Sequence, residues 1–285
     1  MKRSIGLVVP AVLSLLLAAV APVGARSGPA CFGVMPTLLG TEGDNVIQGT
    51  PGDDVIVGMG GNDIVYGGGG RDRICGGAGD DRIYGGPDGD LLDGEGGNDR
   101  VYGQAGNDGY LLGGDGNDVL SPGAGTMDYT ASIEGGAGRD RIVIDQGGYN
   151  EIFGGAGRDT VDLRQAPLAM IIDLKWGEYR SDTAVPTIGG RAWEVEDSYG
   201  SEFADHLWGS AKANRLYGYG GDDVIHGRLG DDTLDGGSGA DQLFGGAGDD
   251  FLSGGPHVGD WLEGEAGFDT CVDPDGWIVC DTCEA

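Results

Sequence analysis

From Gly40 onward, apolar side chains recur at every ninth position, and the residues between them are mostly Gly, Asp and Asn. The shared pattern is G-G-x-G-x-D-x-U-x, where U is apolar, as in GGAGDDRIY at Gly76 and GGAGDDFLS at Gly245. Glycine favours tight turns, so strand propensity is confined to the residues around U. The U position holds Ile47, Ile56, Val65, Ile74, Ile83, Leu92, Val101, Tyr110, Leu120, Leu207, Leu216, Ile225, Leu234, Leu243 and Leu252.

This period predicts a solenoid. Each frame supplies one short strand with a single side chain facing inward, and stacked coils place like strands ~4.8 Å apart. Two frames then make one coil with two strands and two turns. We therefore expect an all-β chain that forms a right-handed parallel β-roll or β-helix in two blocks, with U residues as a thin layer between two sheets.

Interruptions of the repeat divide the chain into segments. We expect a first array over residues 40–121, a loop over 122–134, a short repeat block over 135–162, an inserted β flap over 163–199 and a second array over 200–272. An open solenoid exposes strand edges, so residues 26–39 and the cysteine-containing residues 273–285 are expected to cap its ends.

The insert has its own character. AMIIDLKW and RAWEV indicate two strands, and Trp176, Tyr179 and Trp193 lie in or near them. One interpretation is a contact surface for a carbohydrate or a protein. The preferred one is a packed flap that covers or joins the two blocks.

The amino terminus indicates export. Lys2 and Arg3 precede an apolar run over residues 5–20, and Val23 and Ala25 fit the small-residue rule for cleavage, so residues 1–25 are expected to be a signal peptide. A membrane anchor is the alternative, but the run is short and Pro10 interrupts it. We expect a secreted, extracellular protein that is not inserted in a membrane after cleavage.

Export also permits disulfides. The exported chain has five cysteines, so one is unpaired or pairs between chains. We expect a clip at the tail that joins Cys271 to Cys280 or Cys283. A redox role for the C-x-x-C spacing at Cys280 is disfavoured because no βαβ pattern surrounds it.

The negative net charge of the chain limits the kinds of ligand that it can bind. With 47 acidic and 17 basic residues, the net charge of −30 opposes binding to nucleic acid or to anionic lipid. Carboxylates at this density repel one another and require cations.

Calcium suits the repeat. It takes 6–8 oxygen ligands at ~2.3–2.6 Å, and twice that distance is close to the coil spacing. Each turn offers one sixth-position Asp and several carbonyls beside glycines. Magnesium requires a tighter octahedron, and sites without His or Cys disfavour zinc and copper. Turn-capping by Asp is the alternative, but so many carboxylates in one phase need a cation.

The repeat resembles the RTX family, whose nonapeptide arrays bind calcium in a parallel β-roll. If a site forms between every second frame, roughly ten calcium ions bind. The resemblance leaves Asp269, in the final frame, as an edge case, and Asp88 replaces the third glycine of its own frame. The metal ligands implied by the resemblance are Asp54, Asp63, Asp72, Asp81, Asp90, Asp99, Asp108, Asp118, Asp140, Asp159, Asp205, Asp223, Asp232, Asp241 and Asp250.

No catalytic motif accompanies the repeat. The histidines are His206, His226 and His257, without H-E-x-x-H, and G-x-S-x-G is absent as well. His226, at a ninth position, is expected to face solvent. We expect a secreted calcium-binding protein without catalytic residues. The alternatives are an adhesin or matrix protein that binds polysaccharide on a cell surface, and a polysaccharide-modifying enzyme that acts on the solenoid face.

Overall fold

The computed structural model describes residues 29–274, except 125–129, 146–147, 184–187 and 258. The expected signal peptide and most of the expected carboxyl-terminal cap lie outside these residues. All regular elements in the described part of the chain are β-strands. Within that part, no helix is long and apolar enough to cross a membrane.

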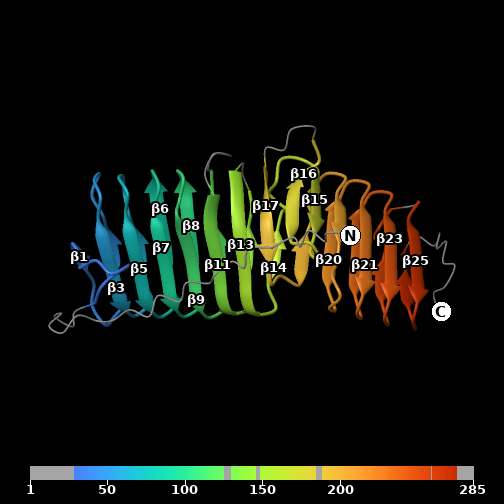
Figure 1. The fold of residues 1–285 in the computed structure, drawn as a ribbon, viewed down its shortest axis with the longest axis horizontal. Helices are drawn as coiled ribbons and strands as arrows, with labels where there is room; N and C mark the ends of the chain where they lie inside the picture. Colours follow the sequence, from blue (N-terminus) through green and yellow to red (C-terminus); the bar gives the residue numbers. More distant parts are fainter. Residues whose placement is uncertain (1–28, 125–129, 146–147, 184–187, 258, 275–285) are drawn as a thin grey trace, which may run out of the picture.

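The chain winds into an elongated solenoid made of two sheets, as the repeat predicts (Figure 1). The 14-stranded sheet has, in spatial order, β1 (Leu38–Leu39), β3 (Val55–Gly60), β5 (Arg73–Ala78), β7 (Leu91–Gly96), β9 (Tyr110–Asp115), β11 (Thr130–Gly138), β13 (Gly148–Gly157), β17 (Ile188–Trp193), β16 (Glu178–Ser181), β15 (Met170–Asp173), β19 (His206–Trp208), β21 (Val224–Leu229), β23 (Gln242–Ala247) and β25 (Trp261–Ala266). The 12-stranded sheet has β2 (Val46–Gln48), β4 (Ile64–Tyr66), β6 (Arg82–Pro87), β8 (Arg100–Ala105), β10 (Val119–Ser121), β12 (Arg141–Val143), β14 (Thr160–Asp162), β18 (Asp197–Tyr199), β20 (Arg215–Gly220), β22 (Thr233–Ser238), β24 (Phe251–Ser253) and β26 (Thr270–Val272).

The core is the layer of U residues. Ile56 pairs in register with Ile74, which pairs with Leu92, and all three side chains are fully buried. The other sheet repeats this with Val65 and Ile83. One inward side chain per frame is therefore enough to build a continuous core, because the coils stack in parallel register.

The prediction that Tyr110 lies in the core was wrong. Leu111, not Tyr110, pairs with Leu92, and its side chain is 0% exposed whereas that of Tyr110 is 47% exposed. The extra residue of this frame lies before Tyr110, at Gly109, rather than at Leu112. The inward position must align with the coil below, so the buried contact decides where an insertion is absorbed.

The insert joins the two arrays through both sheets. Its strand β17 pairs in parallel with β13, and β15 pairs in parallel with β19. The antiparallel strand β16 lies between them. The two strands expected from AMIIDLKW and RAWEV are confirmed. Tyr179 is buried, Trp193 stacks on Phe153 at 4.8 Å, and Trp176 is 67% exposed.

The break between the first array and the short block is narrower than expected. Strand β11 begins at Thr130, within the residues assigned to a loop, and pairs with β9 on one side and β13 on the other. Pairing on both sides makes these residues part of the solenoid.

The amino-terminal segment packs against a sheet face. Cys31 forms a disulfide with Cys75, a pairing that the sequence analysis missed, and it is buried against Val55 and Val57. These side chains lie on the outward side of β3 and β5, while the short strand β1 extends the sheet itself. Cys271 is also disulfide-bonded. Its expected partners, Cys280 and Cys283, lie outside the described residues.

Candidate metal sites in the turns

The sixth-position aspartates of successive coils form two columns, one at each turn of the coil. In one column the backbone N–H of Asp63 donates to Oδ1 of Asp81, and that of Asp81 donates to Oδ1 of Asp99, both at 2.7 Å. In the other column, the backbone N–H of Asp72 donates to Oδ1 of Asp90 at 2.9 Å. One oxygen of each carboxylate thus holds the backbone of the preceding coil.

The second oxygen of these carboxylates is the distinctive feature of the turns. It is buried and has no hydrogen-bond partner, although an unpaired buried acceptor is costly and a buried charge more so. Such a position needs a cation. Of the expected ligands, this Oδ2 is unpaired in Asp63, Asp72, Asp81, Asp90, Asp99, Asp108, Asp118, Asp140, Asp159, Asp223, Asp232, Asp241 and Asp250.

In most of these frames the same oxygen and a main-chain carbonyl of the next coil both lie beside the first glycine of the frame. An ideal Cβ placed on Gly245 would lie 2.5 Å from Oδ2 of Asp250 and 2.7 Å from the carbonyl oxygen of Gly264. Only glycine leaves this space open at the first position of the frame. Carboxylate and carbonyl oxygens converging from two coils are the hard donors that calcium prefers, so these residues fit the ion.

Burial raises the pKa of the column carboxyls in the absence of metal. Desolvation is the largest cause, and repulsion by neighbouring aspartates adds to it, while hydrogen bonds from the backbone oppose both. The pKa rises to about 6 for Asp81, about 7 for Asp90 and about 8 for Asp223. A metal-free column at neutral pH is therefore electrostatically unfavourable.

Two of the expected ligands differ from the rest. Oδ2 of Asp54 accepts hydrogen bonds from the N–H and hydroxyl of Thr50 at 2.7 and 2.8 Å. Oδ2 of Asp205 likewise accepts the N–H and hydroxyl of Ser201 at 2.5 and 3.0 Å. Protein donors already occupy the oxygen that is unpaired elsewhere.

Asp260 is a member of one column that the repeat pattern did not predict. Oδ1 of Asp260 accepts the backbone N–H of Asp241 at 2.9 Å, although Asp260 is the seventh residue of its ten-residue frame. Counting back from the buried Leu262 would have found it. Asp269, the edge case, continues the other column by accepting the N–H of Asp250 at 2.9 Å.

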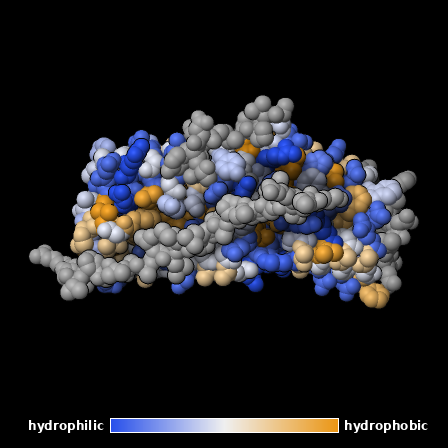
Figure 2. Space-filling view, viewed as in Figure 1, coloured by the Kyte–Doolittle hydropathy of each residue, from blue (hydrophilic) through white to orange (hydrophobic). Residues whose placement is uncertain are grey.

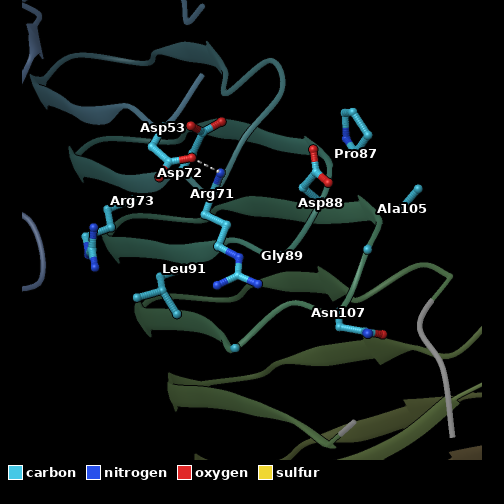
Figure 3. A pocket seen from close by; sticks show the side chains of 12 residues that line it. Asp53, Arg71, Asp72, Arg73, Pro87, Asp88, Gly89, Leu91, Ala105 and Asn107 are labelled. Carbon is cyan, nitrogen blue, oxygen red and sulfur yellow. Dashed lines mark hydrogen bonds between the residues drawn. The ribbon is translucent and has the colours of Figure 1, made fainter. Parts of the chain in front are cut away.

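The irregular frame at Asp88 keeps the turn. Asp88 adopts a positive φ of 83°, as glycine does at this position, and its Oδ2 accepts the N–H of Gly70 at 3.2 Å. Gly89, which has no side chain where other frames have one, lines a hollow of about 780 Å³ together with Arg71, Asp88 and Asn107. Figure 3 shows Arg71 reaching across it toward Gly89, with Asp88 and Asn107 at its other margin.

One acidic cluster lies outside the turns. Donor atoms of Cys75, Asp93 and Glu95 lie within 4.8 Å of one another on the outward face of the larger sheet. The sulfur of Cys75 is bonded to Cys31, so it offers no thiolate to a soft metal.

The outward faces carry stacked rings. Tyr84 stacks between Tyr66 and Tyr102 at 5.1 and 5.2 Å. His226, expected to be solvated, is instead half-buried and stacks on Phe244 at 4.4 Å, and burial lowers its pKa. Figure 2 shows hydrophilic and hydrophobic residues interspersed along the rod. In these stacks the aromatic faces are covered largely by one another.

A family model for the RTX calcium-binding nonapeptide repeat matches residues 39–74, 76–109, 110–126, 134–165, 199–234 and 227–256. These segments cover more than half of the chain. The chain belongs to the RTX calcium-binding repeat family. RTX repeats bind calcium, which agrees with the unpaired oxygens in the turns of this RTX protein. No curated protein matches the chain.

Proposed function

We propose that this RTX protein is a secreted calcium-binding protein without catalysis of its own, whose β-roll folds as calcium binds to the repeat aspartates. The observation that carries the proposal is the set of buried Oδ2 atoms without hydrogen-bond partners, one in each regular turn. In a metal-free chain their burial opposes folding. A ligand that binds the folded state alone stabilises it.

The roles of the residues follow from the turn. Calcium, when bound, supplies positive charge and the missing coordination to the buried oxygen. Asp81 positions its own carboxylate because its other oxygen is held by the N–H of Asp63. The glycine at the first position leaves room for the oxygen and for the carbonyl of the next coil. Metal binding is thereby coupled to the stacking of coils.

Removal of calcium tests the proposal. We expect circular dichroism to show the full sheet signal in millimolar calcium and loss of that signal with a chelator, and calorimetry to show roughly ten bound ions. Chelated protein that keeps its sheet content and melting temperature would exclude folding coupled to calcium.

Secretion is tested separately. The mature amino terminus of protein recovered from the culture medium is expected at Arg26. Retention of residues 1–25, or of the whole protein inside the cell, would contradict that part of the proposal.

A further inference from the structure

Four frames begin with Gly-Thr or Gly-Ser instead of Gly-Gly: GTEGDN, GTPGDD, GSEFAD and GSAKAN. In the regular frames the second residue has a positive φ, even where it is not glycine, as in Met59 at 86° and Tyr219 at 76°. In the four exceptional frames this residue (Thr41, Thr50, Ser201 and Ser210) is absent from the positive-φ conformations. These frames therefore make a different turn.

Hydrogen bonds within the frame close this turn where the carboxylate is present. The hydroxyl of Thr50 donates to Oδ2 of Asp54 at 2.8 Å and accepts the N–H of Gly52 at 3.2 Å. The hydroxyl of Ser201 donates to Asp205 and accepts the N–H of Phe203 at 3.2 Å. The second residue thus links the backbone of the turn to the sixth-position carboxylate.

The other two exceptional frames replace the carboxylate with an amide. Oδ1 of Asn45 accepts the N–H of Thr41 at 2.6 Å, and Oδ1 of Asn214 accepts the N–H of Ser210 at 2.7 Å. Nδ2 of Asn214 donates to the carbonyl of Glu196 at 2.6 Å. The amide oxygen thus accepts the N–H of the second residue, as Oδ2 of Asp54 and Asp205 does. An amide is neutral, so these two turns hold no negative charge that needs a metal.

The four frames occupy equivalent places in the fold. Thr41 and Thr50 belong to the first two frames of the first array, and Ser201 and Ser210 to the first two frames of the second. Each pair of frames supplies one turn to each aspartate column. The backbone N–H groups of Asn45 and Asn214 donate to Asp63 and Asp232, which belong to one column. The backbone N–H of Asp205 donates to Asp223 in the other column. The pair makes up the opening coil of each array.

We propose that these Gly-Thr and Gly-Ser frames form hydroxyl-closed turns that hold no calcium through their own sixth-position side chains, so that each array opens with a coil that folds without metal. This inference rests on the proposed function, because it assumes that regular turns bind calcium. A preformed opening coil gives the following coils a surface on which to stack, and repeat folds propagate from such a formed unit.

Matched amide substitutions test which carboxylates bind calcium. Asp54→Asn is expected to leave the number of calcium ions bound in calorimetry unchanged, because Asn214 shows that the same turn closes with an amide. The other oxygen of Asp54 faces the hydroxyl of Thr37, which can accept from an amide and still donate to the carbonyl of Val55. The regular-turn control Asp72→Asn is expected to bind fewer ions. A loss of ions in Asp54→Asn equal to that in Asp72→Asn would overturn the inference.

A second variant, Thr50→Gly, is measured both with calcium and in chelator. Thr50→Gly changes GTPGDD to a regular GGPGDD frame, so with calcium it should bind an additional ion, and in chelator the amides of the first coil should lose hydrogen-exchange protection. Unchanged protection in chelator would overturn the metal-free turn. Wild-type protein that binds no calcium at all would refute the proposed function instead, while the exchange measurement in chelator would still decide whether the hydroxyl closes the turn.

Discussion

Asp81 binds the coil that precedes its own: its Oδ1 accepts the backbone N–H of Asp63 at 2.7 Å, while its Oδ2 is buried without a hydrogen-bond partner. The two oxygens of one carboxylate therefore have separable roles. One closes the stack through the backbone and the other requires a cation. An amide in place of the carboxylate can keep the first role and loses the second.

Asp81→Asn should lower the stability of the calcium-loaded protein, and it should favour the folded state of the metal-free protein, because it removes a buried negative charge. Loss of one site costs about 2.7 kcal/mol at a calcium concentration about 100 times its Kd. The measurements are denaturant unfolding in calcium and the remaining sheet signal of circular dichroism in chelator. Asp80→Asn is the control, since Asp80 is exposed and its Oδ1 accepts the N–H of Asn98 as an amide oxygen can. Equal effects of the two variants would contradict the assignment.

Gly245→Ala should disrupt one calcium turn. Its Cβ would lie 2.5 Å from Oδ2 of Asp250, and overpacking of this kind costs about 1–3 kcal/mol. Calorimetry should also show fewer bound ions. Gly52→Ala serves as the control because an added Cβ there meets no atom within 4 Å, and we expect both stability and ion number to be retained.

The raised pKa values predict opposite pH responses with and without calcium. In chelator, carboxyls whose pKa is raised to about 6 for Asp81 and about 8 for Asp223 favour the folded state when protonated. The stability of the folded apo state should be greatest near pH 4 and decline as the pH rises through 6 to 8. With calcium, affinity should fall on acidification because protons compete for the same oxygens. Circular dichroism that shows the most sheet at pH 8 in chelator would contradict this.

Removal of the disulfide between Cys31 and Cys75 should loosen the start of the rod. The bond closes a segment of 44 residues, and its loss typically costs about 2–5 kcal/mol. We expect a Cys31→Ala, Cys75→Ala protein to lose hydrogen-exchange protection in β3 and β5, with β21 and β23 of the second array unaffected. Uniform loss along the chain would show that the effect is not local.

The repeat made most of the candidate site predictable. A fixed phase of Asp and U residues is a local property, and stacking at one coil per two frames follows from it, so Asp63 or Asp232 could be assigned without coordinates. The phase failed where a frame is longer than nine residues. There the buried contact between Leu92 and Leu111, rather than a count of nine residues, sets the register, and Asp260 was missed for the same reason.

Other features depend on contacts between distant residues. The disulfide partner of Cys31 is 44 positions away, on the outward face of a strand. The spacing of the cysteines in the sequence does not show that these two residues pack together. The insert reads as an interruption, yet its strands β15 and β17 pair with the coils on either side. Hydrogen bonds between strands join backbone groups and do not require the repeat motif. A segment without the motif can therefore still complete the sheets.

The amino-acid pattern alone determined that this chain is a β-solenoid and that its turns carry carboxylates in columns, because both follow from a period of nine residues and from the chemistry of Gly and Asp. Only the tertiary structure decided which carboxylate oxygens lack a protein partner. Asp54 and Asp63 occupy the same place in the repeat, but the hydroxyl of Thr50 donates to Oδ2 of Asp54, whereas Oδ2 of Asp63 has no hydrogen-bond partner. A buried charge is defined by all the groups around it, and those groups are assembled only when the coils are stacked.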